Sequence, residues 1–312
     1  MRKWLKIAIP SFLLAVGAVL CAVRWQAWFG IPDEPQWRGE TLHYIFPLMM
    51  QDTTPESLDI LVLGDIHNRL TRADYDMLSA HVPQAEAIIQ TGDWMDRGQD
   101  YYYQLLLREF SASRLFSLPV ITCPGNHEYS KGLNKTLAPV WENAFPHPSN
   151  GPIGIPGVHY YVDVDSVRFI IIDTNPLDRL VELTRTQTWL CQTMQQAEGR
   201  YIVVLMHHPV LAVGKGRFNI LEYAAFRHTL GKADLVIAGH DHSYMRRTPF
   251  VILNTAGKPK PQHPLFHVQA MDTIPTYGVL TFKPSGDKAG LTFTVHRMSD
   301  GVQIDSLYVN HN

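Results

Sequence analysis

Short runs of apolar residues that stop at a turn residue dominate the pattern of this chain after position 57. Five such runs occur, at residues 60–63, 87–89, 118–121, 201–206 and 235–238. They are rich in valine, isoleucine and leucine and lack the strict alternation of apolar and polar residues that marks a half-buried strand. The pattern therefore predicts five strands buried on both faces, as in a largely parallel sheet.

Segments of helical character lie between several of these runs, at residues 75–81, 101–110, 186–196 and 221–230. Alternating strands and helices predict an α/β fold. In such folds ligands bind just beyond the carboxyl ends of the strands. We therefore expect the residues that follow the five strands to meet in one crevice.

Other segments predict antiparallel structure. Residues 160–164 and 167–172, which are broken at Asp165-Ser166, predict a β-hairpin. Three further strands are expected at 277–282, 291–295 and 302–308, so the sheets should be mixed. The stretch 129–159, which contains several prolines and glycines, is interpreted as an irregular surface excursion that either contacts substrate or is a solvated connector.

The N-terminus has a different character. An apolar run without charge, residues 7–23, follows Arg2, Lys3 and Lys6 and is closed by Arg24. This pattern favours a retained transmembrane anchor, with a cleaved signal peptide as the alternative. Because the positive flank is N-terminal, the rest of the chain should face away from the cytoplasm. We divide the chain into an anchor or signal segment (1–29), a tether that could instead pack as an edge segment (30–56) and a folded domain (57–312).

The charge and the cysteine content of the chain limit the partners and the covalent or metal cross-links that we expect. The formal net charge of −2 over 312 residues gives no electrostatic reason to expect nucleic acid as a partner. Three cysteines are too few for a disulfide framework or a thiolate zinc site, so Cys123 and Cys191 are interpreted as buried free thiols. The oligomeric state stays open.

Five polar motifs follow the five apolar runs. They are Gly64-Asp65-Ile66-His67, Gly92-Asp93-Trp94-Met95-Asp96-Arg97-Gly98, Gly125-Asn126-His127-Glu128, His207-His208-Pro209 and Gly239-His240-Asp241-His242. We expect seven metal ligands from them: Asp65, His67, Asp93, Asn126, His207, His240 and His242. Two pairs of these ligands are spaced i, i+2, so in an extended backbone both members of a pair would point the same way.

The expected ligands are carboxylates, imidazoles and one amide, without sulfur. Such donors suit iron, manganese or zinc, with nickel and cobalt as further options. The set is what two neighbouring divalent ions require, and a pair of metal ions is a common means of attacking phosphorus with water. Two divalent ions against two carboxylates leave excess positive charge, which would attract a phosphate.

In order and spacing the motifs resemble those of the calcineurin-like metallophosphoesterase superfamily, over residues 57–248. The resemblance implies a four-layer α-β-β-α sandwich of two mixed sheets, with a dinuclear metal centre at the strand ends. It also implies a division of the ligands, in which one metal is held by Asp65, His67 and His242 and the other by Asn126, His207 and His240. Asp93 would bridge the two metals.

The resemblance also implies roles for residues that do not bind metal. His127 would stabilise the transition state and protonate the leaving oxygen, and Asp96 would orient it, as in the similar Ser/Thr phosphoprotein phosphatases. Arg97 would contact phosphate there, but the arginine that those enzymes carry before Gly-Asn-His is replaced here by Pro124. His208 either supports the neighbouring ligand or faces the substrate. The His-His-Pro motif is more similar to the purple acid phosphatases, whose tyrosine ligand is replaced here by Asp96, so no purple colour is expected.

Three charged residues outside the ligand set receive structural interpretations. Asp173 follows an apolar run and is expected to cap its strand end. Arg246 and Arg247 could receive a phosphate, but a pair of arginines after a turn more often forms a solvated face, which is the interpretation adopted here.

The sequence thus predicts a phosphoric ester hydrolase that favours phosphomonoesters and uses in-line attack of a hydroxide held by two metal ions. The alternatives with the same chemistry are a phosphodiesterase and a lipid-pyrophosphate hydrolase acting at the membrane surface. An alternative of another class is a catalytically silent metal-binding scaffold. The intact ligand set and His127 disfavour it.

Overall fold

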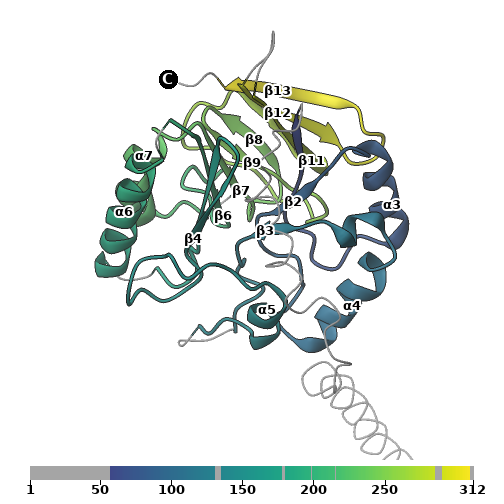
Figure 1. The fold of residues 1–312 in the computed structure, drawn as a ribbon, viewed down its shortest axis with the longest axis horizontal. Helices are drawn as coiled ribbons and strands as arrows, with labels where there is room; N and C mark the ends of the chain where they lie inside the picture. Colours follow the sequence, from purple (N-terminus) through teal and green to yellow (C-terminus); the bar gives the residue numbers. More distant parts are fainter. Residues whose placement is uncertain are drawn as a thin grey trace, which may run out of the picture.

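Two β-sheets form the centre of the molecule, and helices lie on the outer side of each (Figure 1). This computed structural model describes residues 57–130, 135–177, 180–197, 199–214, 216–284 and 290–309. The expected anchor (1–29) and tether (30–56) lie outside the described residues. Across the described ranges, no helix combines the length and apolarity needed to cross a membrane.

The first sheet has six strands in the order β13-β12-β11-β1-β2-β3. Its parallel part is made of β1 (Leu58–Leu63), β2 (Ala87–Gln90) and β3 (Val120–Thr122). Its antiparallel part is made of β11 (Thr276–Lys283), β12 (Gly290–Arg297) and β13 (Gln303–Val309). β1 pairs with β11, with Ile60 opposite Leu280, so the last strands of the chain complete the sheet that the first strands begin.

The second sheet has seven strands in the order β10-β8-β9-β7-β6-β5-β4. The predicted hairpin is formed by β4 (Tyr160–Val164) and β5 (Val167–Ile172). Strands β6 (Tyr201–Met206) and β7 (Leu235–Ala238) continue parallel to β5. The remaining strands are β8 (Tyr244–Arg247), β9 (Phe250–Ile252) and β10 (Ala270–Asp272). The prediction of mixed sheets is confirmed.

Two pairs of helices cover the sheets. Helices α3 (Arg72–His81) and α4 (Asp100–Phe110) lie beside the first sheet, and α6 (Leu180–Gln195) and α7 (Ile220–Leu230) lie beside the second (Figure 1). This order of helix, sheet, sheet and helix confirms the predicted four-layer α-β-β-α sandwich. All four helices overlap the segments of helical character in the sequence, and α6 begins six residues before the expected segment 186–196.

Strand β5 shows why the strand sequences are continuously apolar. Phe169 and Ile171 belong to the hydrophobic cluster that includes both sheets, whereas Ile170 and Ile172 belong to a second cluster with side chains of α6 and α7. All four side chains are fully buried. Because both faces of the strand are covered, a polar residue on either face would lose its contact with water.

Several short elements were not predicted. They are β8, β9, β10, the 3-10 helix η1 (Arg114–Ser117) and helix α5 (Pro139–Ala144). The interpretation of 129–159 as an irregular surface excursion is wrong in part, because Trp141 and Phe145 are each only 1% exposed. The ring centres of Phe145 and Trp94 are 5.6 Å apart, so this stretch packs on the segment that carries the second motif.

The expectation of a solvated arginine face is wrong for Arg246. Its Nε and Nη2 atoms donate to the two oxygens of Asp305 at 2.7 and 3.2 Å, and the Tyr244 hydroxyl donates to the same carboxylate at 2.5 Å. Arg246 belongs to β8 and Asp305 to β13, so this ion pair joins the two sheets. Arg247 instead lies over the ring of Phe266, 5.3 Å from its centre.

The two cysteines of the folded domain are free thiols, as expected. Cys123 is fully buried, and burial raises the pKa of its thiol. Cys191 is only half-buried, so the expectation of a buried thiol is confirmed for Cys123 alone.

Candidate metal centre

The five polar motifs meet at one end of the sandwich, where β1, β2, β3, β6 and β7 stop. Backbone hydrogen bonds connect their loops, since the amides of Ile66 and His67 both donate to the oxygen of Asp93 at 2.9 Å. The amide of Gly239 donates to the oxygen of His207 at 3.1 Å. The side chains of the seven predicted ligands converge in this region.

A first group of possible ligands contains Asp65, His67, Asp93 and His242, whose ligand atoms lie within 4.8 Å of one another. The Nε2 atoms of His67 and His242 are 3.2 Å apart. Asp65 Oδ1 lies 3.9 Å from the first of these nitrogens and 3.6 Å from the second. All four residues are buried. Two imidazole nitrogens facing one carboxylate oxygen form a donor set for a cation.

A second group of possible ligands contains His207, His208 and His240. His207 Nε2 lies 3.2 Å from Asn126 Oδ1 and 3.2 Å from His240 Nδ1. The amide oxygen predicted from the third motif therefore lies beside the imidazoles of the fourth and fifth motifs. His240 faces this group with Nδ1, whereas His207 faces it with Nε2.

Asp93 lies between the two groups. Its Oδ2 atom is 3.6 Å from His67 Nε2 and 3.4 Å from His207 Nε2. Its Oδ1 atom accepts a hydrogen bond from the backbone amide of His127 at 2.9 Å. One carboxylate oxygen thus faces both groups, as a ligand shared by two ions would have to do.

The loops reach this arrangement with a left-handed backbone and not with the extended backbone assumed for the i, i+2 pairs. The φ angle is 49° at Asp65, 52° at His67, 72° at His240 and 53° at His242. The members of each pair share the crevice because each loop turns sharply after its strand. Left-handed conformations of non-glycine residues are sparsely populated and collect at functional sites.

Two glycines make room for the groups that converge around Asp93, which is also left-handed at φ 57°. A Cβ atom on Gly125 would collide with the carboxylate and the backbone nitrogen of Asp93. A Cβ atom on Gly92 would lie 2.6 Å from His207 Nδ1 and from the backbone nitrogen of Gly125. A side chain at either position would therefore displace at least one of the converging groups.

Backbone carbonyls hold the outer nitrogens of two imidazoles. His207 Nδ1 lies 2.9 Å from the oxygen of Thr91, and His242 Nδ1 lies 2.8 Å from the oxygen of Lys258. Such contacts place a proton on the outer nitrogen and turn Nε2 toward the centre.

The electrostatics of the crevice fit a bound metal. Asp65 Oδ1 is buried without a hydrogen-bond partner among the described residues, and burial raises the pKa of Asp65 to about 8. Burial lowers the pKa of His67 to about 3 and that of His242 to about 4, so both imidazoles are neutral. Burial alone would lower the pKa of His207, but the Asp93 carboxylate raises it to about 9. A divalent cation would satisfy the buried oxygen and the neutral nitrogens together.

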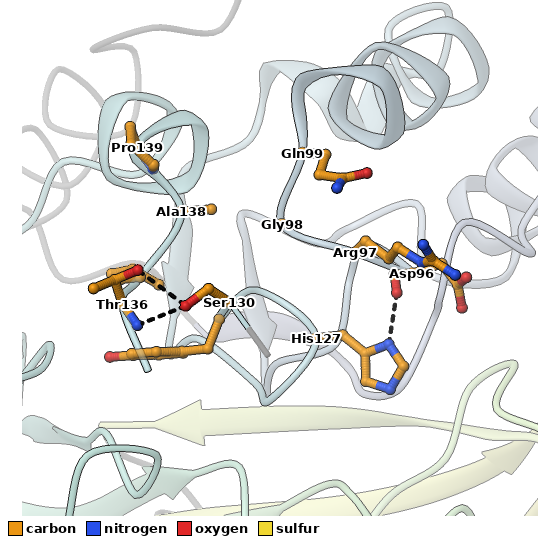
Figure 2. A pocket seen from close by; sticks show the side chains of 11 residues that line it. Asp96, Arg97, Gly98, Gln99, His127, Ser130, Thr136, Ala138 and Pro139 are labelled. Carbon is orange, nitrogen blue, oxygen red and sulfur yellow. Dashed lines mark hydrogen bonds between the residues drawn. The ribbon is translucent and has the colours of Figure 1, made fainter. Parts of the chain in front are cut away.

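His127 lies next to the centre and is partly exposed. Its Nε2 atom is 4.0 Å from Asp93 Oδ2, and its Nδ1 atom is 2.6 Å from the backbone oxygen of Asp96 (Figure 2). The contact between His127 and Asp96 thus runs through the carbonyl, whereas the Asp96 carboxylate lies 3.6 Å from His67 Nδ1. His67, Asp96 and His127 also lie within the distances of a metal-binding group, which shares His67 with the first group.

Arg97 and His208, the two predicted substrate contacts, occupy different places. Arg97 is exposed and lines a cavity beside His127. His208 packs inside the second group, with its ring centre 4.3 Å from that of His240 and its Nδ1 atom 2.7 Å from Thr174 Oγ1.

Glu128 has a role in the site that the sequence analysis did not predict. Its carboxylate accepts hydrogen bonds from the backbone amides of Asp93, Met95 and Gly125 at 2.8, 2.9 and 2.7 Å. One buried side chain therefore fastens the loop of the second motif to that of the third. Its position at the end of the Gly-Asn-His-Glu motif is the feature of the sequence from which this role could have been predicted.

Lys260 was missed as well. Its Nζ atom lies 3.4 Å from His242 Nε2, so a half-buried ammonium group faces the first group of ligands. Lys260 belongs to no motif and stands 18 positions after His242, so its place in the crevice depends on the path of the chain beyond β9.

The sequence profile of the calcineurin-like phosphoesterase family matches residues 58–244. This chain belongs to that family and thus to a class of metal-dependent phosphoesterases. A glycerophosphodiester phosphodiesterase of Enterobacter lignolyticus is 24% identical over 166 residues, which are 51% of this chain and 56% of that protein. The match therefore spans little more than half of the relative.

Solved structures share the fold. GAP50, the anchor in the inner membrane complex of Plasmodium, has a TM-score of 0.59 at 16% identity, over 83% of this chain and 90% of its own. The purple acid phosphatase PPD1 from seeds of yellow lupin (Lupinus luteus) has a TM-score of 0.59 at 14% identity, over 82% of this chain and 54% of its own. At these identities the likeness establishes the architecture alone.

Proposed function

We propose that this protein hydrolyses phosphoric esters with the help of two metal ions, for which iron, manganese or zinc suit the donor atoms. The observation that carries the proposal is the position of Asp93, whose Oδ2 atom faces His67 at 3.6 Å and His207 at 3.4 Å. When bound, the ions would neutralise charge on the phosphoryl oxygens and lower the pKa of a water molecule.

Two sets of side chains would hold the ions. One consists of Asp65, His67 and His242, and the other of Asn126, His207 and His240. Asp93 would belong to both. Glu128 would position this shared ligand, because it holds the backbone amide of Asp93.

His127 would assist departure of the leaving group. The carbonyl of Asp96 next to Nδ1 favours a proton on that nitrogen, so the imidazolium form of His127 would give the second proton, on Nε2, to the leaving oxygen and become a neutral imidazole. Water would enter from the opposite side of phosphorus, in line with the bond that breaks.

The charges around the crevice suit an anionic substrate. Lys260 brings a half-buried ammonium group to the first set of ligands, and Arg97 lies at the edge beside His127. A phosphomonoester carries the larger charge and is the favoured substrate. A diester, as the name of the Enterobacter relative suggests, is one alternative, and a lipid pyrophosphate at a membrane surface is another.

Metal removal tests this proposal. The purified chain is assayed with 4-nitrophenyl phosphate and bis(4-nitrophenyl) phosphate before and after exhaustive chelation. We expect hydrolysis of the monoester to fall to background and to return when Mn²⁺ or Zn²⁺ is added. Activity that survives chelation would contradict the metal mechanism. Tight metal binding without turnover of either ester would favour the silent scaffold.

The N-terminal segment supports a second part of the proposal. The apolar run 7–23 and its basic flank favour a membrane anchor, with the phosphoesterase domain outside the cytoplasm. Secretion after cleavage of the segment is the alternative.

A further inference from the structure

A cavity of about 370 Å³ adjoins the metal centre at His127. Its walls come from the segments that follow the second and third motifs. The lining residues are Asp96, Arg97, Gly98, Gln99, His127, Tyr129, Ser130, Thr136, Leu137, Ala138 and Pro139. Figure 2 shows His127, Asp96 and Arg97 on one side of this His127 cavity and Ser130, Thr136 and Ala138 on the other.

The charged groups of the lining lie at the His127 end of the cavity. The described residues of the far wall carry no charge, and the hydroxyl groups of Ser130 and Thr136 are paired with each other. Ser130 Oγ and Thr136 Oγ1 are 3.0 Å apart, and the amide of Thr136 also donates to Ser130 Oγ at 3.0 Å. Leu137, Ala138 and Pro139 complete this wall with apolar surface.

The far wall is built on packed structure. Pro139 begins α5, whose Trp141 side chain is buried in the core. A Cβ atom on Gly98 would lie 2.7 Å from the Cβ atom of Ala138, so the two walls touch behind the cavity. The His127 cavity is therefore a preformed space, as binding sites for small molecules usually are.

We propose that the His127 cavity binds the leaving alcohol of the ester, and that this alcohol carries an uncharged, largely apolar group of at least the size of an aromatic ring. The inference rests on the proposed function, because His127 would deliver its proton where the cavity meets the metal centre. An inorganic phosphate alone would leave the cavity unfilled, since the smallest ligand sites of this kind hold about 300 Å³.

Two phosphonates that cannot be hydrolysed test the inference without relying on activity. Methylphosphonate and phenylphosphonate present the same anionic head, and only the second carries a ring for the cavity. Binding of each to the metal-loaded protein is measured by calorimetry. We expect phenylphosphonate to bind about tenfold more tightly, the effect of burying part of an aromatic ring.

Variants with larger side chains at the cavity wall test whether the ring of phenylphosphonate binds in the His127 cavity. Thr136 is exposed at the cavity wall, and Thr136→Trp should fill the space and remove most of the preference for phenylphosphonate. Thr136→Leu fills less of it and should reduce the preference by a smaller factor, which provides a second measurement if the tryptophan variant does not fold. Thr188→Trp, an exposed threonine on α6, is the matched control and should behave as the unaltered protein.

The outcomes separate the inference from the proposed function. Equal binding of the two phosphonates would overturn the inference, while hydrolysis of 4-nitrophenyl phosphate would still support the function. A preference that both Thr136 variants leave intact would place the ring elsewhere and would also overturn it. Absence of both phosphonate binding and turnover would reject the function, and the inference with it.

Discussion

At the scale of single residues, the centre depends on which nitrogen each histidine turns toward it. His207 and His242 turn Nε2 inward because backbone carbonyls accept from Nδ1. His127 is held by a carbonyl in the same way, yet its Nε2 atom lies 4.0 Å from Asp93 Oδ2, at the edge of the ligand groups. The same contact thus leaves Nε2 free in all three histidines, and the position of each ring decides whether that nitrogen faces a ligand group.

His127→Ala should lower kcat by about 10²- to 10⁴-fold while the metal content stays unchanged, because the variant lacks a proton donor but keeps all seven ligands. The fall in kcat should be largest for esters with poor leaving groups. Elemental analysis of the purified protein measures the metal. Asp93→Asn is the contrasting variant, and it should lose metal and rate together. Loss of metal from His127→Ala would instead make His127 a ligand.

Lys260→Met should weaken binding of inorganic phosphate to the metal-loaded protein by about tenfold, the usual effect of losing one charge-assisted hydrogen bond. KM should rise by a similar factor and kcat should change less. Lys232→Met removes the same charge from an exposed position and is the control. If phosphate affinity falls equally in both variants, Lys260 does not contact the phosphate and acts only through the net charge of the protein.

The types of the converging residues could be predicted from the sequence, but their local geometry could not. Asp65 and His67 follow a recognisable strand in the sequence, so their position at the end of that strand could be predicted. Their left-handed backbone depends on hydrogen bonds to the oxygen of Asp93, which is distant in sequence. Lys260 has no local signal, because nothing in its own segment indicates which crevice that segment will reach.

At the scale of secondary-structure elements, the ion pair between Arg246 of β8 and Asp305 of β13 connects the two sheets. Asp305→Asn should lower the free energy of unfolding by about 1 kcal/mol at pH 7, a modest value because water screens a partly exposed pair. Asp76→Asn, which breaks an exposed pair with Arg72, should change it by less than about 0.5 kcal/mol. Urea unfolding measures both.

The effect of Asp305→Asn should depend on pH. Burial alone would raise the pKa of Asp305, but its hydrogen bonds from Arg246 and Tyr244 hold it below the usual value. The stabilisation is therefore present above about pH 4 and is lost as the pH falls through the lowered pKa of the folded state. If the difference in the free energy of unfolding between the variant and the unaltered protein persists at pH 2, the ion pair between Arg246 and Asp305 is not its cause.

The long elements could be predicted because their patterns are complete within one segment. The four helices of the outer layers carry a helical pattern, and the strands β1, β5, β6 and β7 are apolar runs that stop at a turn residue. Strand β8 ends in two arginines and β10 in an aspartate, and α5 has only six residues, so none of them shows an apolar run or a helical period. They form because the surrounding structure supplies partners, as Asp305 does for β8.

At the scale of the whole molecule, the proposed anchor predicts where the protein is found. The full chain expressed in bacteria should sediment with membranes, whereas a chain without residues 1–29 should be soluble and keep its phosphoesterase activity. External protease should reach the domain of the full chain in intact spheroplasts. A full chain that is released from membranes intact by high salt would contradict an inserted segment.

The proposed ligands are divided between the two sheets. Asp65, His67, Asp93 and Asn126 follow strands of the first sheet, and His207, His240 and His242 follow strands of the second. Each of the two proposed ions would take ligands from both sheets, so the fit of either ligand group depends on how the sheets pack against each other, and no single loop determines it. Enlarging or shrinking a buried side chain in that layer, remote from the crevice, should therefore change turnover, and gentle loosening of the sandwich should release metal ahead of global unfolding.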